Sequence, residues 1–174
     1  ATKLLRVTPG VARPRWERPL PLHTRCPMLT LGPLLVLPAF QSATVTGAAR
    51  ALRAEDGGDA WTSADVPQRV NTCGLIEGAA HYQVCDDAIV VTGAGDGRAR
   101  ARRPLPVSLT SDVAALVDGV LYLSAPTRLV GVDVVGGHVS VSVDTGAARV
   151  EGVILWGGRG VVLTRAPGLV LGFE

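Results

Sequence analysis

The chain has 174 residues, of which 17 are Lys or Arg and 15 are Asp or Glu, so its formal net charge at pH 7 is +2. A charge this small excludes a dedicated nucleic-acid binder, and the 4% of aromatic residues leaves few rings for stacking on bases or sugars. Hydrophobic residues make up 47% of the chain and charged residues only 18%, which indicates that a partner covers part of the surface.

Residues 1–27 are basic and rich in proline. Their net charge is +5 (6 − 1), whereas that of residues 28–174 is −3 (11 − 14). Proline interrupts helices and removes backbone donors from sheets, so this segment is predicted to be an extended arm. The arm would contact a neighbouring subunit, with Trp16 as an apolar anchor; an equally supported alternative is a strand-like segment packed on its own domain. The candidate partner-binding residues of the arm are Arg6, Arg13, Arg15, Trp16 and Arg18.

The following residues, 28–112, form an irregular first half of the predicted domain. Short apolar runs bounded by proline indicate edge strands at its start, and residues 48–54 contain good helix formers in a run too short to hold as a helix without packing. Residues 55–96 are acidic and contain glycine-rich loops, so a functional site would lie there. Within them, Tyr82–Val84 and Ala88–Thr92 are predicted to pair as a hairpin.

Four arginines occur within six residues at Arg98–Arg103. In an extended segment Arg98, Arg100 and Arg102 would project from one face, and together with Arg103 they complete the set of candidate partner-binding residues. Guanidinium groups without interleaved aromatic rings can contact a nucleic-acid backbone without reading its sequence, or dock on acidic patches of a protein. The low net charge favours the protein partner.

Residues 113–174 consist of short runs of β-branched and apolar residues, cut by glycine-containing turns about every ten residues. This spacing predicts an antiparallel β-meander. The alternation within Val139–Val143 places the valines on one face and the two serines on the other. A V-acid-G-V pattern at residues 117–123 recurs at residues 150–156; either it marks two equivalent corners of a Greek key or it is a chance match.

Catalytic and cofactor motifs do not stand out in the sequence. The glycines at positions 93, 95 and 97 lack the spacing of a phosphate-binding loop, and the three histidines are isolated from one another, so neither a cofactor nor a metal site is expected. The densest titratable cluster contains His81, Cys85, Asp86 and Asp87. A Cys nucleophile with a His base is chemically conceivable there, but a polar hairpin turn is the favoured interpretation.

Three cysteines without a CxxC pair indicate thiols in a reducing compartment, with a Cys73–Cys85 bridge across a hairpin as the alternative. The most apolar run, residues 28–40, is shorter than a membrane span of roughly 18 residues and contains two prolines. We therefore expect an intracellular or virion protein without a membrane span.

Together these patterns predict an all-β protein, an antiparallel sandwich, jelly roll or barrel in a single domain (residues 28–174) with an extended proline-rich arm (residues 1–27). The expected function is a non-enzymatic structural subunit, most consistent with a virus or phage particle component, that contacts copies of itself and other subunits. The alternatives are an accessory subunit of a large cellular complex, such as a mitochondrial one, or a small-ligand-binding barrel or enzyme with a non-local site.

Overall fold

The structure is a computed structural model, and it describes residues 2–6, 13–20, 28–37, 48–63, 74–85, 87–109, 114–146, 149–156, 159–165 and 170–173. Throughout these residues the regular structure is antiparallel β-sheet, without a helix, and no sheet closes into a barrel. The predicted all-β class is therefore confirmed. The described strands of each sheet are neighbours in chain order, so the crossovers of a jelly roll do not occur among them.

The sheets are simple meanders, which we call blades where three or four strands are present. An N-terminal hairpin contains β1 (Thr2–Arg6) and β2 (Trp16–Leu20). Blade 1 contains β3 (Leu29–Leu31), β4 (Leu34–Leu37), β5 (Arg50–Arg53) and β6 (Asp59–Thr62). Blade 2 contains β7 (Leu75–Glu77), β8 (Ala80–Val84), β9 (Ala88–Gly93) and β10 (Ala99–Pro104). Blade 3 contains β11 (Ala114–Val117), β12 (Val120–Ala125), β13 (Arg128–Asp133) and β14 (Val139–Asp144). Blade 4 contains β15 (Val150–Trp156), β16 (Arg159–Thr164) and β17 (Val170–Phe173).

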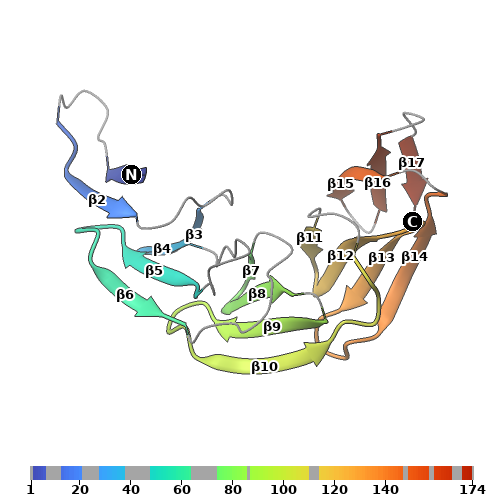
Figure 1. Cartoon of the computed structure of the whole chain (residues 1–174), viewed down its shortest axis with the longest axis horizontal. Helices are drawn as coiled ribbons and strands as arrows, with labels where there is room; N and C mark the ends of the chain where they lie inside the picture. The colour runs from blue at the N-terminus through green and yellow to red at the C-terminus, as the bar shows by residue number, and fades with distance from the viewer. Residues whose placement is uncertain are drawn as a thin grey trace.

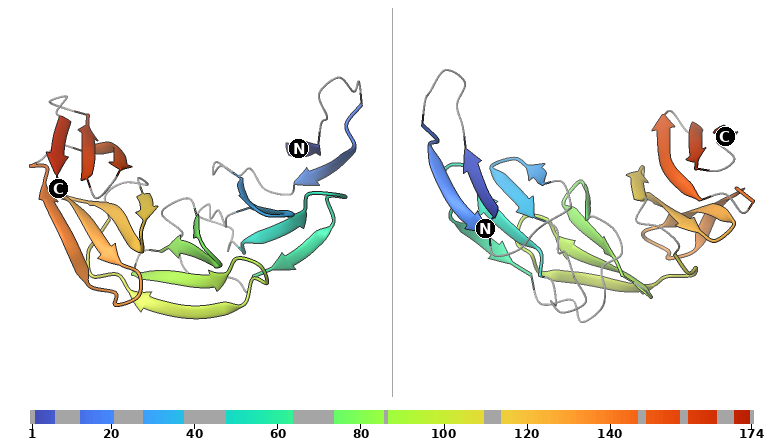
Figure 2. Two further views of the ribbon diagram at one scale, coloured as in Figure 1. Left: turned by 180° about the vertical axis from the view of Figure 1, so that it is seen from behind. Right: turned by 45° about the horizontal axis from the view of Figure 1, so that its top comes forward.

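The blades follow one another around an open crescent (Figure 1). The fourth strands β6 and β10 lie on its convex side, whereas the first strands β7 and β11 lie on its concave side, and two further views show the same arc (Figure 2). Successive four-stranded antiparallel sheets arranged radially are the architecture of a β-propeller. The chain is thus an arc of propeller blades, and the finer expectation of a sandwich, jelly roll or barrel is not confirmed.

An internal repeat of 40 residues underlies the three complete blades. Trp61, Ala101 and Val141 occupy the same place in the fourth strand, at residue numbers 40 apart, and a register shift follows each of these pairings at the same point. The 33-residue echo between residues 117–123 and 150–156 does not reflect equivalence. The first segment contains the turn between β11 and β12, whereas the second lies within β15.

Several local predictions are confirmed. The hairpin of β8 and β9 forms with Cys85 at its turn, where the Cys85 backbone N–H donates to the Ala88 carbonyl over 2.8 Å. In β14 the exposure alternates from Ser140 onward, with Val141 half-buried and Ser142 exposed. Val139 does not follow the alternation: it is exposed, and a register shift separates its pairing from that of Val141. In contrast, the helix-forming composition at residues 48–54 yields strand β5, because its Ala51 and Leu52 are buried on opposite sides of the sheet. The other member of the proposed disulfide, Cys73, lies outside the described residues.

Three hydrophobic clusters hold the blades together, one at each blade-to-blade contact. We call the face of a blade that is directed toward the next blade along the chain its forward face. The largest cluster joins the forward face of blade 2 to blade 3, and its members are Val84, Ile89, Val91, Leu121, Leu123, Val130, Val132 and Val134. The core therefore lies between sheets, and each internal blade is buried on both faces.

Candidate interaction surfaces

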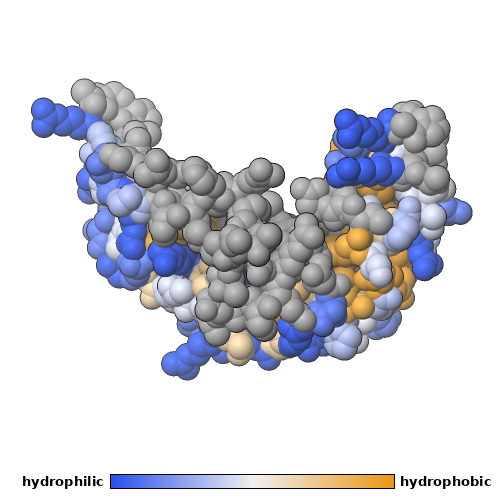
Figure 3. Space-filling model, in the orientation of Figure 1, coloured by the Kyte–Doolittle hydropathy of each residue, from blue (hydrophilic) through white to orange (hydrophobic). Residues whose placement is uncertain are grey.

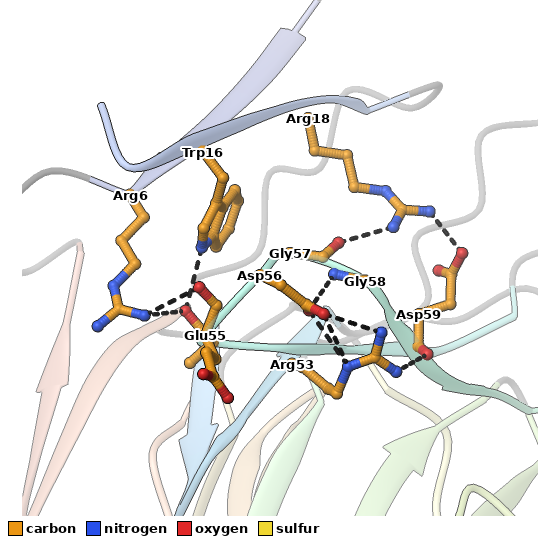
Figure 4. Close-up of polar contacts among 10 residues, drawn as sticks. Arg6, Trp16, Arg18, Arg53, Glu55, Asp56, Gly57, Gly58 and Asp59 are labelled. Atoms are coloured by element: carbon orange, nitrogen blue, oxygen red, sulfur yellow. Dashed lines mark hydrogen bonds and ion pairs between the residues drawn. The ribbon is translucent and has the colours of Figure 1, made fainter. Parts of the chain in front are cut away.

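The N-terminal hairpin packs on blade 1 of its own chain through three of the candidate partner-binding residues (Figure 4). Arg6 donates to the carbonyl oxygens of Ala54 (2.7 Å) and Glu55 (3.2 Å). Trp16 Nε1 donates to the Ala54 carbonyl over 3.1 Å. Arg18 donates to the Gly57 carbonyl over 2.7 Å and forms an ion pair of 2.6 Å with Asp59. For these side chains the structure thus shows the alternative of a strand-like segment packed on its own domain. An extended arm is not confirmed.

The tryptophan contact on blade 1 is repeated one blade further along. Trp16 lies over Gly57, where a Cβ would be 2.7 Å from the indole, and Trp61 lies over Gly97 in the same way. Trp61 Nε1 donates to the Ala94 carbonyl over 3.2 Å, as Trp16 does to Ala54. Both glycines have positive φ, +70° and +66°, a region that other residues rarely adopt. In both cases the last strand of one unit, β2 or β6, thus attaches to the turn between the third and fourth strands of the next blade.

The remaining basic candidates lie on exposed surface, except Arg103, which is half-buried. Arg13 and Arg15 precede β2 and are exposed, as is Arg98 before β10. Within β10, Arg100 pairs with Asp96 (2.7 Å) and Arg102 pairs with Asp87 (2.9 Å), and Arg103 donates to the carbonyl of Val135 in blade 3. The arginine run is therefore largely matched by acidic and carbonyl groups of its own chain. Exposed pairs of this kind contribute roughly 0–1 kcal/mol each.

These contacts set the charge state of the carboxylates. The hydrogen bond from Arg18 lowers the pKa of Asp59 below its ordinary value. The pKa of Asp96 is also lowered, first by the backbone N–H of Arg98 and then by the side chain of Arg100. Both carboxylates therefore stay ionised at neutral pH, and their negative charges balance the positive charges of the neighbouring arginines.

The suggested cysteine–histidine site is not assembled. Cys85 and His81 are both fully buried, whereas Asp87 is exposed and paired with Arg102; Asp86 lies outside the described residues. Burial lowers the pKa of His81 to about 4, so its imidazole is neutral at pH 7. Among the residues that the structure describes, no group of three His, Cys, Asp or Glu side chains could hold a metal ion. In the same described part, no helix is long and apolar enough to cross a membrane.

A polar cluster that the sequence did not indicate is buried beside blade 1. His81 Nδ1 lies 3.2 Å from the Thr92 hydroxyl, while His81 Nε2 and both amide atoms of Gln83 have no hydrogen-bond partner among the described residues. Both His81 and Gln83 are completely buried. Burying a polar group without a partner costs free energy.

The forward face of blade 4 is the most unusual surface of the molecule. Val153 and Val162 pack toward blade 3, so the residues next to them in sequence, Ile154 and Leu163, point the other way, together with Trp156. These three side chains are 55%, 37% and 52% exposed, respectively. In Figure 3 the visible apolar surface gathers mainly over the strands of blade 3, and little of it is seen on blade 4 in this view.

The equivalent positions of the internal blades are covered. Leu163 is the fifth residue of β16, and the fifth residues of the second strands in blades 2 and 3 are Val84 and Ser124, which are 0% and 1% exposed. The sequence held a signal for this surface: residues 153–156 are apolar at every position, the pattern of a strand that is buried on both faces. Only one of those faces is covered by described residues.

No family model and no curated protein sequence matches the chain. Among solved structures, it is similar to the computationally designed Ika4 protein, with 14% identity over 87% of this chain and 92% of that one and a TM-score of 0.61. It is also similar to BamB from Moraxella catarrhalis, with 17% identity over 92% of this chain and 55% of that one and a TM-score of 0.58.

A third similar structure is KlHsv2 with loop 6CD replaced by a Gly-Ser linker, with 13% identity over 93% of this chain and 52% of that one and a TM-score of 0.60. The chain thus spans about half the length of BamB and KlHsv2. Identities of this size show the fold alone. What the comparisons establish for this chain is an arc of antiparallel propeller blades.

Proposed function

We propose that the protein is a non-enzymatic assembly subunit and that two copies associate through the forward face of blade 4. The observation that supports this proposal is the exposure of Ile154, Trp156 and Leu163 at positions of the kind that the next blade covers elsewhere in the chain. Exposed apolar groups of this size on one sheet face are typical of protein–protein contacts. Trp is also the residue type most enriched among those that dominate binding energy.

A second copy is the partner that fits the surface. Glu17 and Pro19 on β2 are exposed, as are Arg13 and Arg15 before it. An apolar face would gain little from docking on that end of the arc. The matching apolar surface is the same face of another copy, which gives a twofold contact in which each side contributes the same residues. The partly exposed side chains correspond to a few kcal/mol on each copy, from which the cost of association is subtracted, so the dimer is expected to be weak.

Sedimentation velocity at concentrations from micromolar to about millimolar tests the proposal. The unmodified chain should show a concentration-dependent dimer, and Trp156→Asp or Leu163→Asp should abolish it, because a carboxylate cannot be buried without a partner. Val135→Asp is the matched control, since Val135 is 72% exposed and apolar but lies on a turn of blade 3. A monomer at every concentration, or a dimer that both blade 4 variants retain, would overturn the proposal.

The larger assembly to which such a subunit would belong is proposed from the sequence alone as a virus or phage particle, or a large intracellular complex. An accessory role in a cellular complex uses the same surface and would pass the same test. The enzyme and ligand-binding alternatives instead require a site formed by groups that are distant in sequence. The described residues supply the buried cluster of His81 and Gln83 for that, but without an accessible nucleophile.

A further inference from the structure

The turn between β13 and β14 repeats the two turns on which a tryptophan lies, although none of the described residues places an indole on it. Its Gly137 has a φ of +73°, close to the +70° of Gly57 and the +66° of Gly97. The Gly137 N–H donates to the Asp133 carbonyl over 2.8 Å. The same bond, also of 2.8 Å, joins Gly97 to Gly93. The backbone that supports an indole in blades 1 and 2 is therefore formed again in blade 3.

The space over Gly137 is open because the preceding blade contributes a small side chain. The residue of β10 at the place of Trp61 is Ala101. A Cβ added to either of the other two glycines would overlap an indole ring. For a Cβ added to Gly137, the only described atom within 4 Å is the Cβ of Arg103, at 3.9 Å. The described residues therefore leave open the volume that an indole fills at the other two turns.

The open turn is accessible from solution. Gly57 and Gly97 are buried under their indoles, whereas Gly137 is partly exposed. Val135, two residues before Gly137 in the same turn, is 72% exposed. Ala101, on the opposite side of the junction between blades 2 and 3, is half-buried. An aromatic ring carried by another molecule can therefore reach this turn from outside.

A hydrogen-bond acceptor lies three residues before each of these glycines. Trp16 Nε1 donates to the carbonyl of Ala54, and Trp61 Nε1 donates to that of Ala94. Val134 holds the same position in the turn of blade 3. An indole bound over this turn would find an apolar surface for its ring and a carbonyl oxygen for its N–H, which a buried indole requires.

The N-terminal hairpin shows how a strand attaches to such a turn. Trp16 in β2 lies over Gly57, and Arg18, two residues later, donates to the Gly57 carbonyl over 2.7 Å. Among the described strands β2 pairs only with β1, so side chains hold it on blade 1. A strand of another polypeptide can therefore use the same contacts without joining a sheet of this chain.

We propose that the turn at Gly137 binds a tryptophan of a partner polypeptide, with the indole over the glycine and its N–H on the Val134 carbonyl. The partner segment is extended and has an arginine two residues after the tryptophan, the arrangement of Trp16 and Arg18 on blade 1. The site lies between blades 2 and 3, away from the forward face of blade 4. The inference therefore goes beyond the proposed dimer and does not depend on it.

The probe is a peptide with the sequence of residues 14–20, which contains the tryptophan and the arginine of β2, added to the full isotope-labelled chain. The hairpin of the chain itself occupies Gly57, so the added peptide reports on Gly137. The NMR signals of the Gly137 and Val135 amides should shift and saturate. The same peptide with Trp16→Ala should bind at least about tenfold more weakly. Absence of binding, shifts confined to other residues, or equal binding of the two peptides overturns the inference.

The source of the indole is tested with N-acetyl-L-tryptophanamide, which has the ring but no arginine. The peptide should bind at least about tenfold more tightly than this compound, because its guanidinium adds a charged hydrogen bond to the Gly137 carbonyl. Equal affinities would indicate a site for free indole compounds and overturn the assignment of a polypeptide partner.

A substitution at the glycine places the binding site. Gly137→Val should lower the affinity for the peptide at least about tenfold, because the new side chain takes the place of the ring. Gly146→Val is the matched control, since Gly146 also has a positive φ (+61°) and open space around it but lies after β14. The control variant should bind the peptide as the unmodified chain does. Equal affinities of the two folded variants contradict the assignment.

A second variant supplies the indole from the chain itself and decides the question if Gly137→Val is not folded by circular dichroism. Ala51 faces Trp61 in blade 1, whereas Val91 faces Ala101 in blade 2. The double variant Val91→Ala with Ala101→Trp reproduces the first pair and should abolish peptide binding and raise the melting temperature relative to Val91→Ala alone. Undiminished peptide binding by this double variant would show that the peptide does not occupy the place of the indole.

Discussion

The indole of Trp61 lies directly over Gly97, so that one blade is attached to the next by a ring that rests on a backbone without a side chain. A Cβ on Gly97 would overlap the six-membered part of the ring, and the hydrogen bond from Trp61 to the Ala94 carbonyl fixes the ring in that place. The neighbouring contact of Trp16 with Gly57 has the same construction. The attachment of the N-terminal hairpin to blade 1, and of blade 1 to blade 2, therefore depends on glycine at one position of the turn between the third and fourth strands.

Replacement of Gly97 by alanine should destabilise the protein by about 1–3 kcal/mol, because the residue has positive φ and the added methyl group displaces Trp61. The free energy of unfolding from chemical denaturation measures this change. Gly95→Ala is the matched control in the same turn, since its φ is not positive and a Cβ there would meet nothing within 4 Å. Equal effects of the two substitutions would mean that Trp61 does not rest on Gly97.

Acid should weaken the contact between blades 1 and 2 through His81. The pKa of this buried imidazole is lowered from 6.5 to about 4, so the unfolded chain takes up the proton at a higher pH than the folded one. The contribution of neutral His81 is present above pH 6.5 and is lost as the pH falls toward 4. At about 1.4 kcal/mol for each pKa unit, the loss amounts to at most about 3.5 kcal/mol.

Denaturation midpoints between pH 7 and pH 4 measure this dependence, and NMR titration of the imidazole in the unmodified chain measures the pKa directly. The non-titrating variant His81→Gln should flatten the stability profile between pH 6.5 and 4. The exposed His138 serves as the control, since His138→Gln should leave the profile unchanged. A His81 imidazole that titrates near pH 6.5 in the folded protein would contradict its burial.

Loss of Arg18 should loosen the N-terminal hairpin. Its guanidinium donates to the Gly57 carbonyl and pairs with Asp59, so Arg18→Ala should raise the pKa of Asp59 toward its ordinary value and increase hydrogen exchange in β1 and β2. Global stability should fall by about 1 kcal/mol or less, because Asp59 is exposed. The exposed Arg15 provides the comparison, and Arg15→Ala should leave the pKa of Asp59 unchanged. A similar response to both substitutions would show that the hairpin does not dock through Arg18.

The sequence by itself determined the class of the fold and its local elements. The alternation within Val139–Val143 and the turn at Cys85 are period-two and hairpin signals that involve residues close in the chain. A strand has to bury one face, and that requirement can be read from neighbouring residues. Local reasoning did not decide residues 48–54, which contain good helix formers in a run too short to hold as a helix without packing. Burial of Ala51 and Leu52 outweighs a helix propensity of a few tenths of a kcal/mol per residue there, and the segment forms strand β5.

Only the tertiary structure decided how the strands are grouped into blades and which surfaces stay exposed. The 40-residue repeat relates Trp61 to Ala101 and Val141, residues of different chemistry, so the sequence conceals an equivalence that backbone pairing reveals. The arginines of β10 looked available for a partner, but folding brings Asp87 and Asp96 to them. Likewise, Leu163 resembles any core residue in the sequence. Its exposure follows from its position on the last described blade, because contacts between blades are set by packing across long distances in the chain.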